Sequence, residues 1–275
     1  MANPANSPLK QQIPFEMVYQ VVALIVALIL VHLVYITVIR PNADAIMSER
    51  AERLAQGEDF IQERSLYVVL KDFEQEACFV LMLWAMAIMG YKGLVALRER
   101  SLLSDDIVKV SEGMSILPED TREYTRGIQA LPEETQSYLL PRALMAALQR
   151  FASTRNVQDV SEAVKNVCET ESNRLDTELS MVRYIAWAIP SIGFIGTVRG
   201  IGEALGQAYK AVEGDIAGVT ASLGVAFNST FTALVISIVI MFMMHQLQLI
   251  QERLVLDTQT YADQRLLRHL QVRSQ

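Results

Sequence analysis

The feature that most constrains this chain is a run of 35 residues, from Ile216 to Ile250, that contains no Asp, Glu, Lys or Arg. A helix rises about 1.5 Å per residue, so the run is longer than the roughly 30 Å hydrocarbon core of a bilayer. We therefore predict a membrane-spanning helix that tilts or projects beyond the bilayer surface.

Two other runs have the composition of a spanning helix. Met17–Ile39 contains no acid, lysine or arginine and is followed by Arg40. A signal peptide would have a shorter apolar core and a cleavage site of small residues. Tyr184–Val198 is also uncharged, and mainly apolar and small residues continue to Ala208. We predict that both runs span the membrane.

A fourth run is shorter. Ala77–Tyr91 carries no charge, Lys92 then interrupts it, and apolar residues continue to Leu97. A lysine inside a span can extend its ammonium group toward the lipid headgroups. We predict a span here too; the alternative is a buried or interfacial helix.

The predicted fold class is an all-α integral membrane protein with four transmembrane helices and a large cytoplasmic helical segment between the second and third. The predicted segments are an N-terminus at 1–16, spans at 17–39, 77–97, 184–206 and 216–250, a loop at 40–76, the helical segment at 98–183, a connection at 207–215 and a helical tail at 251–275.

Charge predicts the orientation of these spans. The N-terminus, the stretch 92–183 and the tail from Gln251 contain 17 Lys and Arg, whereas 40–77 and the connection contain six. Positively charged loops stay in the cytoplasm. We therefore place both termini and the 98–183 segment in the cytoplasm, and the acidic 40–76 loop outside.

The 98–183 segment has helical spacing of apolar residues, with proline-containing turns expected at Leu117-Pro118, Leu131-Pro132 and Leu140-Pro141. A second periodic stretch runs from Val157 to Leu179, and residues 251–270 look like a continuation of the fourth span. These helices are either solvated or packed against another subunit.

Several classes of function are excluded or disfavoured by composition. The net charge of −7 argues against nucleic acid as a partner. Two cysteines, Cys78 and Cys168, make neither a disulfide framework nor a metal site. The three histidines are scattered, and no catalytic or nucleotide-binding motif is found. We therefore expect neither an enzyme nor a bound cofactor.

The third span combines glycines with a proline. Gly196 and Gly200 form a GxxxG pair, as do Gly202 and Gly206, and small residues one turn apart let helices approach closely in lipid. Pro190 removes a backbone donor, so the carbonyl about one turn earlier needs a partner from a neighbour, a hydroxyl or water.

The fourth span has two faces at 100° per residue. Small and hydroxyl side chains share one face, and bulky apolar residues fill the other: Ser222, Ala226, Ser229, Ala233 and Ser237 against Leu223, Phe227, Phe231, Leu234 and Ile238. Thr230 lies at one edge of the small face, and Asn228 and Thr232 lie at the other. The hydroxyls either line a polar route or bond to carbonyls of their own helix.

No Asp or Glu lies inside the four uncharged runs. Proton carriers in membranes are usually carboxylates or histidines. His32 and His245 are candidates, but His32 lies in the least polar span and His245 toward the cytoplasmic end of its run. If the chain conducts protons, we expect a partner to supply the acid.

These residues resemble the MotA/TolQ/ExbB proton channel family. Pro190, Gly193, Gly196-Thr197-Val198 and Gly200 follow the family's P-x-x-G-x-x-G-T-V-x-G pattern, and Thr230 falls at the family's hydroxyl position in the last span. The resemblance covers about 50–60 residues together with the order of the parts.

The resemblance implies a pentamer around a dimer of single-span partners of the MotB/TolR/ExbD kind, whose membrane aspartate fills the gap noted above. Ion flow would drive rotation of one ring against the other. It implies a bacterial inner-membrane location, contact with lipid, and H⁺ or Na⁺ as the translocated ion. We expect Thr197, Thr230, Thr232 and Asn228 to line the ion pathway.

Two features depart from the family pattern. The 40–76 loop is long for a MotA-like plan, and Arg199 brings a charge to the motif's variable position. Arg199 lies four residues before Glu203, which favours a salt bridge on one helix face; a gate is the alternative.

The sequence supports two hypotheses of function. The first is the ion-conducting subunit of a stator-type rotary motor, in which Pro190, Gly193, Gly196 and Gly200 serve helix packing and hinge motion. The second is a non-conducting oligomeric membrane scaffold, which would use the glycines for assembly alone.

Overall fold

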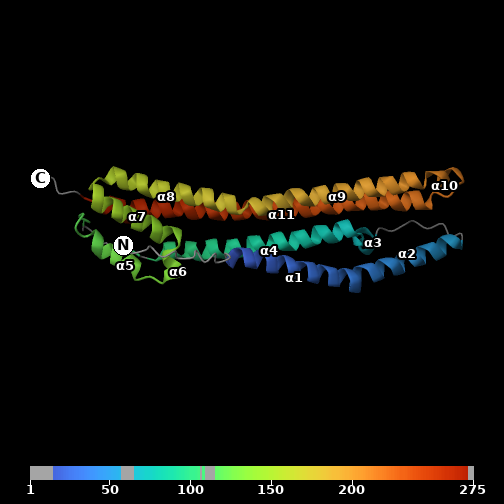
Figure 1. Ribbon diagram of the computed structural model, residues 1–275, viewed down its shortest axis with the longest axis horizontal. Helices are drawn as coiled ribbons and strands as arrows, with labels where there is room; N and C mark the ends of the chain where they lie inside the picture. Colours follow the sequence, from blue (N-terminus) through green and yellow to red (C-terminus); the bar gives the residue numbers. More distant parts are fainter. Residues whose placement is uncertain (1–14, 57–64, 106, 109–114, 272–275) are drawn as a thin grey trace, which may run out of the picture. The chain divides into compact units, whose positions relative to one another are not determined.

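The computed structural model describes residues 15–56, 65–105, 107–108 and 115–271. Most of the predicted N-terminus at 1–16 and part of the 40–76 loop lie outside these ranges. Within them the chain is helical, with one isolated bridge between Ile116 and Leu270 (Figure 1). The helices are α1 (Phe15–Val34), η1 (Tyr35–Ile39), α2 (Arg40–Ala55), α3 (Leu66–Leu70), α4 (Phe73–Ser101), η2 (Leu102–Ser104), α5 (Thr121–Gln129), α6 (Glu133–Gln136), α7 (Leu139–Thr154), α8 (Val157–Glu178), α9 (Ser180–Gly206), α10 (Ala208–Val212), α11 (Ala217–Arg265) and η3 (Leu267–His269).

Four helical stretches among the described residues are long and apolar enough to cross a membrane: Glu16–Arg50, Phe73–Ser104, Val157–Gly206 and Ala217–His269. The all-helical class and the four candidate spans are thereby confirmed. The shorter apolar run at 77–97 is among them, because α4 begins at Phe73 and continues through Lys92 to Ser101.

The chain forms two compact units, each made from two stretches of sequence. The first unit consists of residues 1–88 and 184–241, and the second of 89–183 and 242–275. Helices α4, α9 and α11 each contribute residues to both units.

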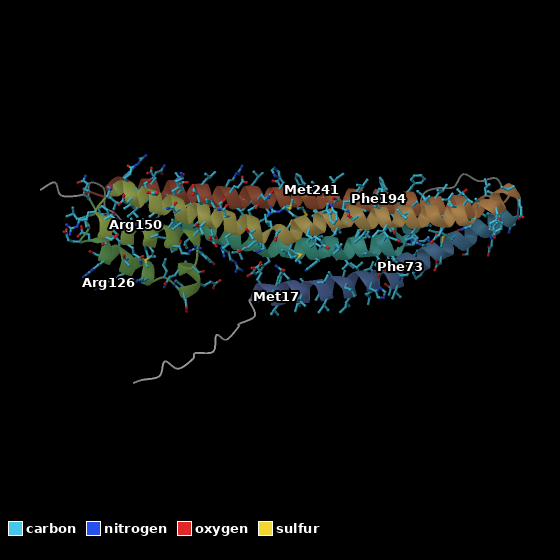
Figure 2. All side chains as sticks on the ribbon, turned by 45° about the horizontal axis from the view of Figure 1, so that its top comes forward. Met17, Phe73, Arg126, Arg150, Phe194 and Met241 are labelled. Carbon is cyan, nitrogen blue, oxygen red and sulfur yellow. The ribbon has the colours of Figure 1, made fainter. Side chains whose placement is uncertain are left out.

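The first unit contains α1, the start of α4, and the parts of α9 and α11 that lie side by side (Figures 1 and 2). Two hydrogen bonds connect α1 to α4: the Tyr19 hydroxyl donates to the Ala87 carbonyl at 3.1 Å, and the Trp84 indole to the Gln20 carbonyl at 2.9 Å. Large apolar side chains are exposed on α1, α9 and α11, including Phe194 and Met241 (Figure 2). Such a surface fits a lipid environment.

The second unit has an apolar core of its own. Helices α7 and α8 pack as a hairpin, in which Leu144, Leu148 and Phe151 are fully buried against Val160 and Val164. Arg155 ends α7 in the left-handed region at φ 53°, and the Asn156 side chain then accepts a hydrogen bond from the Gln158 amide at 3.0 Å, which caps α8.

The end of α11 joins this core through Tyr261, Ala262 and Leu266. The Tyr261 hydroxyl donates to the Asp105 carbonyl and accepts from the Ile107 amide, both at 3.1 Å. Most of the periodic apolar residues of 251–270 therefore pack within their own chain, whereas Leu256 is exposed. The sequence did not predict this packing, because it left open only solvated helices or packing on another subunit.

One predicted turn is wrong. Leu140-Pro141 lies inside α7, which begins at Leu139. A proline is tolerated in the first turn of a helix because the amide it lacks would have no partner within the helix. The turns at Pro118 and Pro132 do separate helices.

Candidate functional site

Three glycines of α9 lie directly against α11 in the first unit. A Cβ atom on Gly193 would be 2.5 Å from the Ala233 Cβ, and one on Gly196 would be 2.5 Å from the Ser229 Cβ. A Cβ on Gly200 would be 2.6 Å from the Ser222 carbonyl oxygen. Real Cβ atoms do not come this close, so only glycine permits this separation of the two helices.

The sequence predicts close packing by these glycines but does not say which helix they meet. The close neighbour that the Gly193, Gly196 and Gly200 face requires is α11 of the same chain, so that face gives no ground for a second copy. By contrast, Gly202 and Gly206 have no atom within 4 Å of an added Cβ. The second GxxxG pair therefore makes no close packing contact within the chain.

The two faces predicted for the fourth span are present in α11. All five residues of the small face, from Ser222 to Ser237, are buried, while Phe227, Phe231, Leu234 and Ile238 are exposed. The bulky face is thus directed away from the rest of the chain. This exposure is appropriate for contact with lipid or with another subunit.

Pro190 lies inside α9, and the structure supplies the partner that its missing amide makes necessary. The carbonyl one turn earlier belongs to Ala186, and it accepts a hydrogen bond from the Ser237 hydroxyl of α11 at 3.2 Å. Of the partners considered from the sequence, a hydroxyl from a neighbouring helix is the one present.

The hydroxyls of Thr197 and Thr230 meet between α9 and α11. Their Oγ1 atoms are in direct contact, and Thr197 Oγ1 also lies 3.2 Å from the Ala226 carbonyl and 3.3 Å from that of Gly193. Thr230 Oγ1 lies 3.3 Å from the same Gly193 carbonyl. Two hydroxyls and two carbonyls therefore form a compact, neutral polar site in an otherwise apolar pair of helices.

The other two candidate pathway residues lie apart from this pair. Asn228 is half-buried and Thr232 is buried, and they share the opposite edge of the small face of α11. No hydrogen bond joins either described side chain to Thr197 or Thr230. The structure thus brings together two of the four predicted pathway residues.

Comparison with known proteins agrees with this part of the chain. Residues 136–260 match the model of the MotA/TolQ/ExbB proton channel family. This match covers less than half of the chain, and we call residues 136–260 the family domain. The matched family is described as one of proton channels. No curated protein and no solved structure matches the chain.

The MotA/TolQ/ExbB domain covers α7, α8 and α9 and most of α11, so it contains the glycine face and both threonines. Helices α1, α2 and α4 lie outside the matched residues. The family match therefore gives no information on how these helices contact the domain.

Arg199 makes one such contact. Its guanidinium binds both carboxylate oxygens of Glu74 at the start of α4, at 2.7 and 2.8 Å, and Glu203 at 3.2 Å. The predicted salt bridge with Glu203 is present, but the two-point contact with Glu74 is the shorter one. Arg199 thus links the family domain to α4 as well as stabilising its own helix.

Sequence reasoning missed the polar start of α4. Glu74, Gln75 and Glu76 were assigned to the loop because charge ended the apolar run, yet α4 begins before them and both Gln75 and Glu76 are buried. Glu76 is bound by His32 Nδ1 at 2.6 Å and by Arg40 at 2.5 Å. The sequence did contain a signal for this earlier start of α4. The helical spacing of residues continues without a break from Glu76 into the apolar run.

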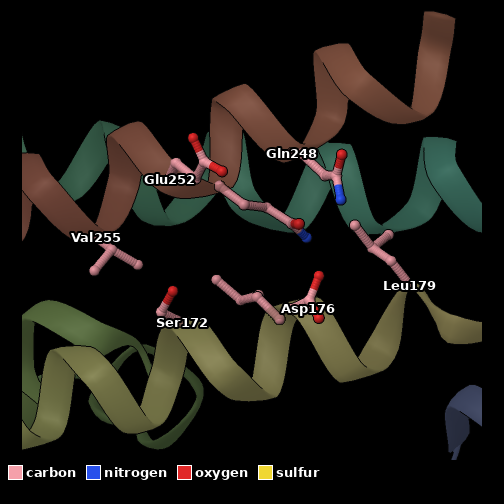
Figure 3. Close-up of a pocket in the computed structure, with 8 residues that line it drawn as sticks. Ser172, Asp176, Leu179, Gln248, Glu252 and Val255 are labelled. Carbon is pink, nitrogen blue, oxygen red and sulfur yellow. The ribbon is translucent and has the colours of Figure 1, made fainter. Parts of the chain in front are cut away.

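The second unit contains a small open pocket between α8 and α11 (Figure 3). Its volume is about 60 Å³, and Ser172, Asp176, Gln248 and Glu252 are among the lining residues. Asp176 already accepts a hydrogen bond from Arg183 at 2.7 Å, which holds the pKa of that carboxyl below its usual value. A space of this size accommodates a few water molecules.

Proposed function

We propose that the chain is the ion-conducting subunit of a stator-type motor complex, which converts the energy of a proton gradient, or alternatively a sodium gradient, into mechanical work. The observation that carries this proposal is the Thr197–Thr230 contact inside the family domain. The two hydroxyls can donate and accept hydrogen bonds, so they can hold water or a partly dehydrated cation.

The proposal includes a partner and an assembly. The charged residues of α9 are Arg183, Arg199 and Glu203, and α11 has none up to Ile250, so neither helix places a carboxylate beside the two threonines. A single-span partner dimer of the MotB/TolR/ExbD kind would supply an aspartate beside the threonines. The family resemblance supports a pentamer of this chain around that dimer, in contact with lipid through its exposed apolar faces.

We also propose a bacterial inner-membrane location with both termini in the cytoplasm. The excess of Lys and Arg on that side supports this orientation. It places the loop at 40–76, together with the start of α4, on the external side.

The test is ion flux in liposomes that contain the chain with its partner, under an imposed membrane potential. Thr197→Val and Thr230→Val keep the side-chain volume and remove the hydroxyl, so both should lose flux. Thr220→Val is the matched control, because the Thr220 hydroxyl lies on the same helix and bonds only to the Ile216 carbonyl at 2.9 Å among the described contacts.

Each result has a clear consequence. Unchanged flux in both pathway variants, with normal assembly, would contradict the assignment of the ion route. A complex that assembles but conducts no ions would instead support the alternative function, a non-conducting oligomeric scaffold. Strong flux from the chain without its partner would contradict the shared site.

A further inference from the structure

Glu76 is a buried carboxylate held by two helices of the first unit. Its Oε1 atom lies 2.6 Å from His32 Nδ1 on α1, and its Oε2 atom lies 2.5 Å from the Arg40 guanidinium at the start of α2. Glu76 lies 44 residues from His32 and 36 residues from Arg40 in the sequence. The contact therefore exists only in the folded first unit.

Nδ1 is the nitrogen of His32 that faces Glu76. An ionised carboxylate only accepts hydrogen bonds, so with Glu76 ionised and a neutral imidazole Nδ1 is the donor and Nε2 has the free lone pair. The His32 side chain is 51% exposed, whereas that of Glu76 is 11% exposed. The His32 ring is thus open on the side away from Glu76, whereas the carboxylate is enclosed by the first unit.

Three buried oxygens of nearby residues have no hydrogen-bond partner among the described contacts. They are the Tyr35 hydroxyl, Asp72 Oδ2 and Gln75 Oε1, and the residues Tyr35 and Gln75 are 1% and 0% exposed. Tyr35 is one turn from His32 and begins η1, a π-helical turn of a kind often found at functional sites. Asp72 accepts from the Glu76 amide at 3.2 Å through its carbonyl, and Gln75 precedes Glu76 in α4.

Gln75 also connects this group to the threonine site. Its Nε2 atom donates to the Ser229 hydroxyl of α11 at 3.3 Å. Ser229 is adjacent to Thr230 in sequence, and its Cβ is the atom that an added Cβ on Gly196 would strike. These contacts lead from α4 to the two helices that hold Thr197 and Thr230.

The charged groups around His32 and Glu76 come from several elements. Besides Arg40, the turn before α4 brings Lys71 and Asp72, which form a pair at 3.0 Å. Helix α9 contributes Arg199, which is held by Glu74 on the neighbouring position of α4. Helix α11 contributes the neutral Ser229 and no charge, so the site has no cation on the side of the threonines.

We propose that His32, held by Glu76, binds protons at the external end of the first unit and passes them toward the Thr197–Thr230 pair. In this step an N–H bond forms at Nε2 of His32, the Nδ1–H bond breaks, and the proton moves to Oε1 of Glu76. The imidazole is neutral again after the step, and Glu76 returns to its ionised form by giving the proton to water on the side of the threonines. The inference rests on the proposed function, which makes this end external.

The experiment measures proton flux in liposomes containing the chain and its partner, as a function of external pH between about 5 and 8, where histidine changes charge. His32→Gln should lower the flux by about tenfold and flatten its dependence on external pH. This loss is smaller than the 10²-fold that a positioned proton-transfer group often contributes, because water can also deliver protons. Glu76→Gln should have the same effect.

Two further variants separate proton transfer from structure. His32→Arg keeps a hydrogen-bond donor beside Glu76 but does not release a proton, so it should conduct as poorly as His32→Gln. His245→Gln removes the histidine of α11 and should leave the flux unchanged. Normal flux in His32→Arg, or an equal loss in His245→Gln, would overturn the proposal.

The threonine variants make the two proposals distinguishable. If Thr230→Val abolishes the flux while His32→Gln and Glu76→Gln conduct normally at every pH, the ion route stands and the His32 site is refuted. If neither threonine variant changes the flux, the proposed function itself fails. Size-exclusion chromatography of each complex confirms that every variant compared has assembled.

Discussion

Gly200→Ala should destabilise the packing of α9 against α11 more than any other glycine substitution in the first unit. The added Cβ would lie 2.6 Å from the Ser222 carbonyl oxygen, 2.7 Å from the Ala226 nitrogen and 2.9 Å from the Ala226 Cβ. Two of these three atoms belong to the backbone, so no change of side-chain conformation relieves the contact.

The geometry gives the size of the effect. Ordinary contacts of a Cβ begin at 3.4 Å, so the two helices would have to separate by about 0.8 Å at this point. Overpacking of this kind costs about 1–3 kcal/mol. Gly202→Ala is the matched control, since its added Cβ meets no atom within 4 Å and alanine favours a helix over glycine by up to about 1 kcal/mol.

The assay is unfolding of the purified chain in mild detergent, followed by circular dichroism against denaturant. A rescue variant sharpens the test. Gly193→Ala meets mainly the Ala233 Cβ, so Ala233→Gly should restore much of its stability. Ala226→Gly should rescue Gly200→Ala only weakly, because the backbone contacts remain. Equal stability of Gly200→Ala and Gly202→Ala would refute the reasoning.

Three further predictions concern single contacts. Ser237→Ala should cost about 0.5–1.5 kcal/mol of stability in the wild-type chain. It should cost clearly less in a Pro190→Ala background, because the Ala186 carbonyl regains its helical partner there. A double-mutant cycle measures the difference. Glu74→Ala should destabilise the chain more than Glu203→Ala, because only the first breaks a two-point ion pair to arginine, and equal unfolding midpoints would contradict this. Burial raises the pKa of the Cys168 thiol to about 11, so at pH 8 about one thiol in a thousand is ionised. Alkylation of Cys168, detected by peptide mass spectrometry, should therefore require unfolding. Rapid labelling of the native chain would count against a closed core in the second unit.

Most of the individual helices could be predicted from the sequence. The length of an uncharged run compared with the bilayer predicts each span, and 100° per residue separates Ser222, Ala226 and Ser229 from Phe227 and Phe231. Both signals are local, since they depend only on neighbouring residues and on fixed helical geometry. Pro190 likewise predicts an unsatisfied carbonyl without any knowledge of the fold.

Start points of helices were harder to predict when a charged residue lay at the boundary. Glu74 and Glu76 end an apolar run by composition, yet they lie inside α4 because their charges are matched by Arg199 and Arg40. A paired charge costs far less to bury than a single one, and the pairing partner lies on another helix. Composition alone does not show that a charged residue has a partner on another helix.

By itself, the sequence determined that the chain has four apolar helices, that one face of the last is lined with small residues, and that its final helices resemble a proton channel family. Only the tertiary structure decided that Gly193, Gly196 and Gly200 pack against α11 of the same chain. It likewise decided that Ser237 satisfies the Ala186 carbonyl, and that His32 meets Glu76. The physical reason is that a helix is specified by contacts three or four residues apart, whereas the choice of a neighbouring helix depends on side chains separated by tens of residues.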